Sequence, residues 1–110
     1  MISDQLLAFV AEELSAEITH LGVGSGAAPD VDDETLPDEE LRKIATSYLD
    51  GVEVIKEIYL DETELNGITL KSAGVYGSGN TKLYAGGSFE VLKQSGESLT
   101  ISVELTVGRE

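Results

Sequence analysis

The last part of the chain alternates strictly between apolar and polar side chains. Leu99, Ile101, Val103, Leu105 and Val107 fall on one side of an extended backbone, and Thr100, Ser102, Glu104 and Thr106 fall on the other. Because successive side chains of a strand point to opposite faces, this pattern predicts a strand with one buried face and one wet face. The pattern is typical of an antiparallel sheet.

The same period of two begins at Gly51. Three further strands are predicted before the last one, at Val52–Leu60, Ile68–Tyr76 and Leu83–Leu92. Asn66-Gly67 is a tight-turn signal and is predicted to lie within a hairpin. Gly77–Asn80 and Gln94–Glu97 are predicted to be the other connections. Residues 51–110 are therefore expected to be antiparallel strands.

The N-terminal segment, residues 1–18, has helical periodicity instead. Ser3 is a good N-cap, because its hydroxyl can accept a hydrogen bond from a free amide of the first turn. The apolar residues fall three or four apart and form one stripe: Leu6, Leu7, Val10, Leu14 and Ile18. Two interpretations stay open. The helix packs on its own domain, or it is a contact helix for a neighbouring subunit.

Residues 18–50 connect these two parts. Ile18–Gly26 is predicted to be a short strand that runs into a glycine-rich turn, and an acidic loop with Pro29 follows. Asp38–Tyr48 is predicted to be a second, shorter helix, since Leu41, Ile44, Ala45 and Tyr48 would share one face. In an alternative interpretation, Lys43–Tyr48 is extended.

These elements predict an α+β fold that is mostly β. An N-terminal helix would be followed by a four- to five-stranded antiparallel, β-sandwich-like domain. A length of 110 residues suggests a single domain spanning residues 1–110.

The charge of the chain is strongly negative. There are 21 Asp and Glu against 7 Lys and Arg, a formal net charge of -14. Binding of nucleic acid, or of an anionic membrane surface, needs basic residues, so neither is expected. Two explanations of the acidity remain, a surface adapted to concentrated salt or a surface that imitates DNA for a basic partner. The acids are dispersed along the chain, which favours the first.

No pattern predicts catalytic, cofactor-binding or metal-binding residues. The chain has no cysteine, and its one histidine, His20, is expected to be a packed strand residue rather than a base. The run Gly22–Gly26 lacks the Lys and Ser or Thr of a phosphate loop, so it predicts a turn where backbones pass closely. The acidic loop 30–34 does not have the spacing of an EF-hand, and an irregular cation site there stays open.

No apolar run approaches the roughly 20 residues that a membrane-spanning helix needs. The N-terminus lacks the basic start of a signal peptide. We therefore expect a protein that is made in the cytoplasm without a cleaved leader.

Several short segments follow one another in a recognisable order. The segment Ile18-Thr19-His20-Leu21-Gly22-Val23-Gly24-Ser25-Gly26 comes first, and Ala28-Pro29 through Asp33 forms the loop that follows. Leu36, Glu39 and Arg42 come next, and Ser72–Tyr76 comes later. In this order the segments resemble motifs of small virion proteins of tailed phages, and of modules of their tail-fibre and baseplate proteins. Ser72–Tyr76 is similar to their later Glu-x-Gly-Leu-Phe motif, with Ser72 in place of the acidic residue.

The resemblance implies a non-enzymatic structural component of a virus particle, located in the virion and made in the host cytoplasm. The implied role is in the tail or baseplate, as a homo-oligomer that packs against copies of itself and other virion proteins. A capsid decoration or head–tail connector role is an alternative. Together with the acidity, the resemblance implies a haloarchaeal tailed virus as the source. The hypothesis from another class is an acidic DNA-mimic inhibitor of a basic nucleic-acid-binding protein.

Overall fold

One helix precedes seven strands in the computed structural model, which describes residues 1–108. The elements are α1 (Asp4–Glu17), β1 (Ile18–Gly24), β2 (Glu39–Ile44), β3 (Thr46–Asp50), β4 (Glu53–Leu60), β5 (Ile68–Gly77), β6 (Lys82–Lys93) and β7 (Leu99–Thr106). Arg109 and Glu110, which end the segment predicted to be antiparallel strands, lie outside the described residues.

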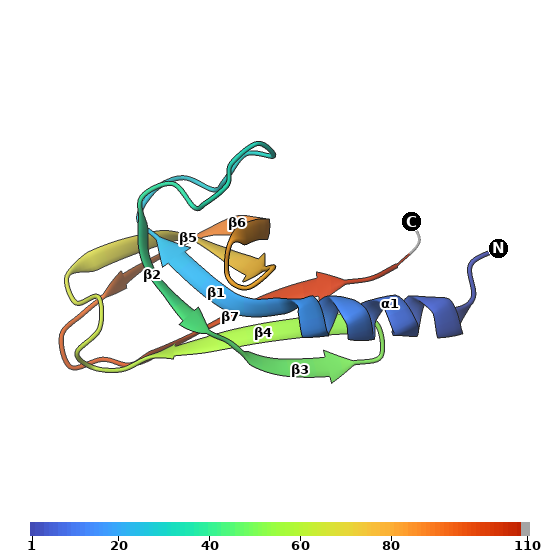
Figure 1. The fold of residues 1–110 in the computed structure, drawn as a ribbon. Helices are drawn as coiled ribbons and strands as arrows, with labels where there is room; N and C mark the ends of the chain where they lie inside the picture. The colour runs from blue at the N-terminus through green and yellow to red at the C-terminus, as the bar shows by residue number, and fades with distance from the viewer. Residues whose placement is uncertain (109–110) are drawn as a thin grey trace.

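The strands form two antiparallel sheets (Figure 1). One sheet has the order β2-β1-β5-β6 and will be called sheet A. The other has the order β3-β4-β7 and will be called sheet B. The predicted class, α+β and mostly β, is confirmed. The number of strands is seven rather than four or five, chiefly because the segment expected to be a second helix forms two of them.

The prediction of a helix at Asp38–Tyr48 is wrong. The segment forms β2, which pairs with β1, and then β3, which pairs with β4. Ala45 lies at the corner between them, and its amide donates to the carbonyl of Thr19 at 2.9 Å. Asp38 has a φ of 50°, outside the helical region, so no helix starts there. Tertiary pairing with two existing strands has overridden a local pattern that suits either conformation.

The prediction of a hairpin around Asn66-Gly67 is also wrong. The turn itself is present, and Gly67 has a φ of 81°, which glycine adopts without steric cost. However, β4 belongs to sheet B and β5 to sheet A, so the turn carries the chain from one sheet to the other. A turn signal predicts the local backbone conformation, but it does not determine whether the two strands on either side of the turn pair with each other.

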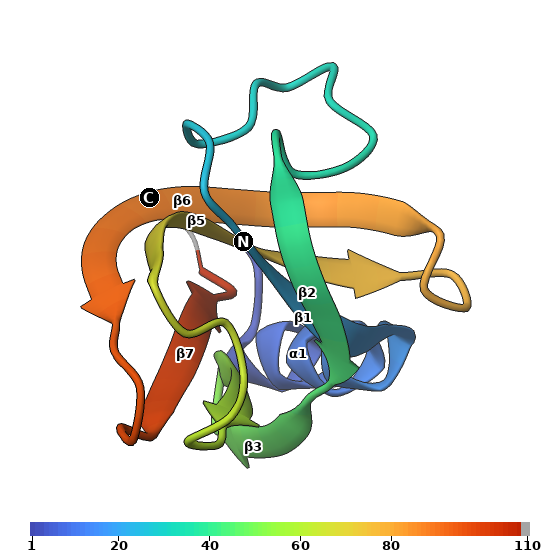
Figure 2. The same cartoon turned by 90° about the vertical axis from the view of Figure 1, so that its left-hand side faces the viewer.

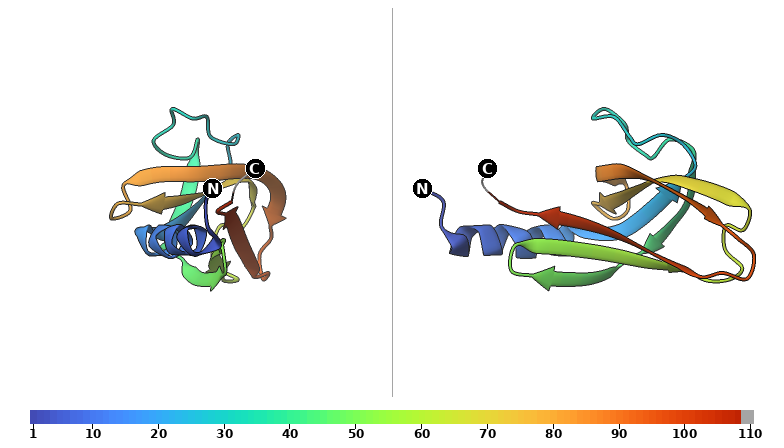
Figure 3. Two further views of the ribbon diagram at one scale, coloured as in Figure 1. Left: turned by 90° about the vertical axis from the view of Figure 1, so that its right-hand side faces the viewer. Right: turned by 180° about the vertical axis from the view of Figure 1, so that it is seen from behind.

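The core lies between the two sheets (Figures 2 and 3). It combines apolar side chains from both: Ile18, Leu21, Val23, Leu70, Ala73 and Val75 of sheet A, with Ile58, Leu60 and Ile101 of sheet B. On β7, Ile101 is buried and Leu99, Val103 and Leu105 pack against the core, while the intervening polar residues are exposed. The alternation predicted for this strand is confirmed.

Helix α1 begins as predicted, since Ser3 Oγ accepts a hydrogen bond from the amide of Leu6 at 3.1 Å. The side chains that α1 buries differ from the predicted apolar stripe. Leu7 and Ala11 face the core, whereas Leu6 and Val10 point outward. The predicted stripe therefore included residues from two adjacent faces of the helix.

The C-terminal end of α1 is held by Lys56 of β4, which is fully buried. Its Nζ donates to the carbonyl of Ser15 at 2.6 Å and to Ser47 Oγ of β3 at 2.7 Å. The carbonyl of Ser15 belongs to the last turn of the helix, where a positive charge is favoured. Burial lowers the pKa of this lysine. One side chain thus joins the helix to the edge strand β3 and the middle strand β4 of sheet B.

Candidate functional site

Three glycines of sheet A, Gly24 of β1, Gly74 of β5 and Gly86 of β6, form a platform for the loop of residues 25–38, which stands above the sheet (Figures 1 and 2). A Cβ on Gly24 would come within 2.9 Å of the carbonyl oxygen of Pro37, and one on Gly86 within 2.7 Å of Pro29. A Cβ on Gly74 would come within 3.0 Å of the buried Leu36. These distances leave no room for a side chain. The glycines let the loop approach the sheet, and at Gly24 this agrees with the close passage of backbones predicted for Gly22–Gly26.

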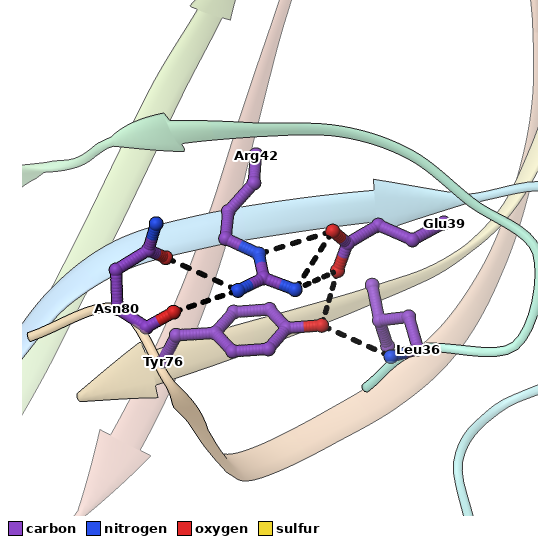
Figure 4. A network of polar contacts seen from close by, with 5 residues as sticks. All are labelled: Leu36, Glu39, Arg42, Tyr76 and Asn80. Atoms are coloured by element: carbon purple, nitrogen blue, oxygen red, sulfur yellow. Dashed lines mark hydrogen bonds and ion pairs between the residues drawn. The ribbon is translucent and has the colours of Figure 1, made fainter. Parts of the chain in front are cut away.

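A polar network fastens the base of this loop (Figure 4). The hydroxyl of Tyr76, on β5, donates to Glu39 Oε1 and accepts from the amide of Leu36 at 2.9 Å. Arg42 lies over the Tyr76 ring, 3.6 Å from its centroid. The same guanidinium forms an ion pair with Glu39 at 2.8 Å and donates to the carbonyl of Asn80 at 2.8 Å. Tyr76 and Arg42 therefore link the end of the loop 25–38, β2, β5 and the turn at Asn80 in one network.

The electrostatics of this network favour a structural role. Tyr76 is fully buried, and burial together with the bond to Glu39 raises its pKa to about 12. Its hydroxyl already donates one hydrogen bond and accepts another. Glu39 accepts from both Arg42 and Tyr76. A general acid or base must reach its substrate with a free proton or lone pair, and these groups are already satisfied by one another.

One buried polar group beside the platform has no such partner. The hydroxyl of Ser72, on β5, is buried and makes no hydrogen bond to the described residues. It lies 3.1 Å from where a Cβ on Gly24 would be.

The acidic loop closes on itself. The amide of Asp30 donates to Asp33 Oδ2 at 2.8 Å, and the amide of Asp33 donates to the carbonyl of Asp30 at 3.0 Å. Among residues 1–108, no group of three or more His, Asp or Glu side chains is arranged to hold a metal ion. His20 lies on β1, where its Nδ1 is 2.7 Å from Thr19 Oγ1. The structure does not bring these sequence candidates together into a site.

Exposed apolar side chains gather instead on α1. The outer face of α1 is defined here as Leu6, Phe9 and Val10, which are 49 %, 56 % and 40 % exposed. Met1 and Ile2 precede it and are exposed as well. The core-facing stripe of the helix is separate, so these side chains contribute little to the fold of the chain itself. Contiguous apolar residues in water are a mark of a contact surface.

A second exposed apolar group lies where β2 turns into β3. Ile44 is 78 % exposed, and Tyr48 and Leu49 of β3 are also exposed. A hollow of about 460 Å³ runs between this segment and α1, and Ala16, Ile44 and Leu49 line part of it. Every residue of β3 is exposed, although the strand is fully paired with β4 on one side.

Most of the negative charge is not neutralised within the chain. Arg42 and Lys43 form ion pairs with Glu39 and Glu64. By contrast, the buried Lys56 contacts neutral oxygens, as described above, and Lys93 Nζ donates to the amide oxygen of Asn66 at 2.9 Å. Two of the seven basic residues, Lys56 and Lys93, therefore donate hydrogen bonds to neutral oxygens within the fold.

The helical pattern left open a contact role for α1, but its outer face was not separated from the row that faces the core, although the signal is present. Leu6 and Val10 are four apart, and so are Leu7 and Ala11, one position further on. Two parallel rows cover more of the helix circumference than one core contact needs. If the two rows had been treated as separate faces of the helix, one row would have been assigned to the core and the other to a further contact.

No protein-family model, curated protein or solved structure matches this chain. Among residues 1–108, no helix combines the length and the apolar character that crossing a bilayer requires.

Proposed function

We propose that this chain is a non-enzymatic structural subunit that packs against copies of itself. The observation that carries the proposal is the outer face of α1. Three large apolar side chains lie in water on the first turns of a helix whose other side already contacts the core. Full burial of such a side chain from full exposure gains about 1.5–3 kcal/mol, and because these three are about half exposed, each gains about half of that against another subunit.

The shape of the molecule supports the same role. Its extents are 50 × 28 × 26 Å, and its radius of gyration is 14.6 Å, against about 13 Å for a compact domain of this size. The first turns of α1 and the end of β7 project together beyond sheet A (Figures 1 and 3). A projecting apolar helix is accessible to a neighbouring subunit.

The negative charge sets the conditions for assembly. Two copies with a net charge of -14 repel each other, and salt screens that repulsion over about 10 Å at 0.1 M and about 3 Å at 1 M. Apolar contact is not weakened in the same way. Assembly is therefore expected to strengthen as the salt concentration rises.

The test replaces the outer face of α1 with serine, as Leu6→Ser, Phe9→Ser and Val10→Ser together, and measures molar mass by light scattering in molar KCl. The matched control is Leu92→Ser on β6, because Leu92 is 47 % exposed and lies outside α1. The wild type and the control are expected to be oligomers and the triple variant to have a lower mass. Equal masses for all three proteins would contradict the proposal.

The place of assembly that we propose is the tail or baseplate of a tailed virus. The support is the resemblance of Ile18–Gly26, the loop through Asp33, and Ser72–Tyr76 to tailed-phage virion proteins, together with the acidity expected of a salt-loving host. Mass spectrometry of purified virus particles from the source culture tests this part. The chain is expected there in many copies, and its recovery only from cell lysate would refute the viral role.

A further inference from the structure

Strand β3 is an edge strand with the features of a pairing surface. It forms one edge of sheet B, pairs with β4 in a regular register from Thr46↔Glu57 to Asp50↔Glu53, and is exposed at all five residues. Among residues 1–108, no strand pairs with the backbone groups on its other side. Natural edges are usually protected by lysine, proline or a bulge. The sequence Thr46-Ser47-Tyr48-Leu49-Asp50 contains neither residue, and its pairing contains no bulge.

The other three edges of the two sheets are modified. β2 carries Glu39, Glu40, Arg42 and Lys43, and its pairing with β1 has a register shift. β6 pairs with β5 through two register shifts. β7 lies beside residues 85–88 of sheet A across a hollow of about 280 Å³. Among these edges, β3 is the one that is regular, open and nearly uncharged.

The sequence of β3 is compatible with itself in antiparallel pairing. If two copies pair with Tyr48 opposite Tyr48, Thr46 lies opposite Asp50 of the second copy and Ser47 lies opposite Leu49. The only charged residue thus faces a hydroxyl rather than its own copy, so no like charges are directly opposed. An aromatic pair at the centre adds to the stability of such a ladder. A twofold axis through Tyr48 makes both halves of the contact identical.

We propose that β3 pairs with β3 of a second copy and joins two sheets B into one continuous six-stranded sheet across a twofold axis. This inference rests on the proposed function and names the surface through which one of its contacts is made. The occupant of the edge is a second copy of this chain rather than an unrelated peptide, because the register places compatible residues opposite each other along the whole strand.

The neighbouring surface extends the contact beyond the strand. A specific interface takes about 800 Å² from each partner, which is about one eighth of the 6465 Å² surface of this chain. Five residues of a strand supply only part of that area. Ile44 and the hollow between α1 and β3 lie beside the edge and are apolar. A second copy that pairs along β3 can cover them at the same time.

The chain lacks cysteine, so single cysteines report the contact without interference. Tyr48→Cys is expected to form a disulfide between copies under mild oxidation in molar KCl. Tyr59→Cys is the matched control, because Tyr59 is 56 % exposed on β4, an inner strand of the same sheet. A mixture of Thr46→Cys and Asp50→Cys should give the mixed disulfide, which fixes the register. Tyr59→Cys reacting as fast as Tyr48→Cys would overturn the inference.

A second variant tests the contact without oxidation. Tyr48→Lys places two ammonium groups opposite each other and removes the aromatic pair, so it should weaken the dimer about tenfold or more. Tyr48 is half exposed, so the fold should tolerate the change, which circular dichroism would check.

The outcomes separate this inference from the function on which it rests. An oligomeric wild type with no Tyr48→Cys disulfide, and with an unchanged mass for Tyr48→Lys, overturns the β3 contact and leaves self-assembly standing. A wild type that is monomeric at every salt concentration overturns both.

Discussion

At the scale of single residues, Tyr76 is the clearest link between sequence and structure. Its ring lies under Arg42, and its hydroxyl bonds to Leu36 and Glu39, so one residue of β5 holds the end of the loop 25–38 where the chain rejoins the sheet. Removing the hydroxyl as Tyr76→Phe leaves the amide of Leu36 without its acceptor. The expected cost near pH 7 is about 1–3 kcal/mol of unfolding free energy.

The raised pKa of Tyr76 predicts that the stability of the fold depends on pH. Below pH 10 the tyrosine is protonated in both the folded and the unfolded chain, so its contribution to stability is complete. Between pH 10 and about 12 the unfolded chain loses the proton and the folded chain keeps it, so stability falls as the pH rises. A shift of this size is worth about 2–3 kcal/mol. Urea unfolding of the wild type and Tyr76→Phe should show their difference shrinking above pH 10, and a constant difference would contradict this.

Substitution of Ser72 is expected to have the opposite effect on stability. Its buried hydroxyl has no hydrogen-bond partner among residues 1–108, so Ser72→Ala removes an unsatisfied polar group and should leave stability unchanged or raise it. Ser47→Ala is the contrasting variant, because Ser47 Oγ accepts from Lys56 Nζ at 2.7 Å. Its expected cost is about 1–3 kcal/mol. Thermal unfolding measures both, and a clear loss of stability in Ser72→Ala would show that its hydroxyl has a role.

At the scale of elements, adjacent glycines of β6 test the loop platform. Gly86→Ala brings a Cβ within 2.7 Å of Pro29, whereas Gly87→Ala meets nothing within 4 Å. The first should cost about 1–3 kcal/mol through overpacking. The second should be neutral or stabilising by about 0.4–1 kcal/mol, since alanine restricts the unfolded chain. Urea unfolding distinguishes them, and equal stabilities would mean that Pro29 does not pack on the sheet.

The elements that could be predicted are those whose signal is local. Ser3 caps α1, and the alternation through Ile101 marks β7, and both are present as expected. Asp38–Tyr48 fails because spacings of three and four also occur in two strands joined at a corner, and only pairing with β1 and β4 decides between them. Asn66-Gly67 fails for a related reason, because a turn does not specify which sheet the next strand joins.

The candidate surfaces were harder to predict than the fold. The sequence gives the apolar residues of α1, but which row faces the core depends on where sheet B lies beneath the helix. The open edge of β3 depends on strand order, which no local pattern contains. Both surfaces therefore become visible only once the sheets are assembled.

At the scale of the whole molecule, the excess of negative charge is expected to lower stability at low salt. Asp50 and Glu53 lie directly opposite each other on β3 and β4, as one instance of a general excess of like charge. Glu53→Gln should stabilise the fold by about 0.2–1 kcal/mol at low salt and have little effect in molar KCl, where the repulsion is already screened. Urea unfolding at both salt concentrations tests this, and a gain of equal size at both would argue against electrostatic strain.

The molar mass of the wild-type protein shows whether the chain assembles with itself. Light scattering from low to multimolar KCl should show a discrete oligomer that appears or persists as the salt concentration rises, because screening removes repulsion while the outer face of α1 and the edge of β3 remain to be buried. A monomer at every salt concentration would contradict self-assembly, and the exposed apolar side chains would then need a different partner.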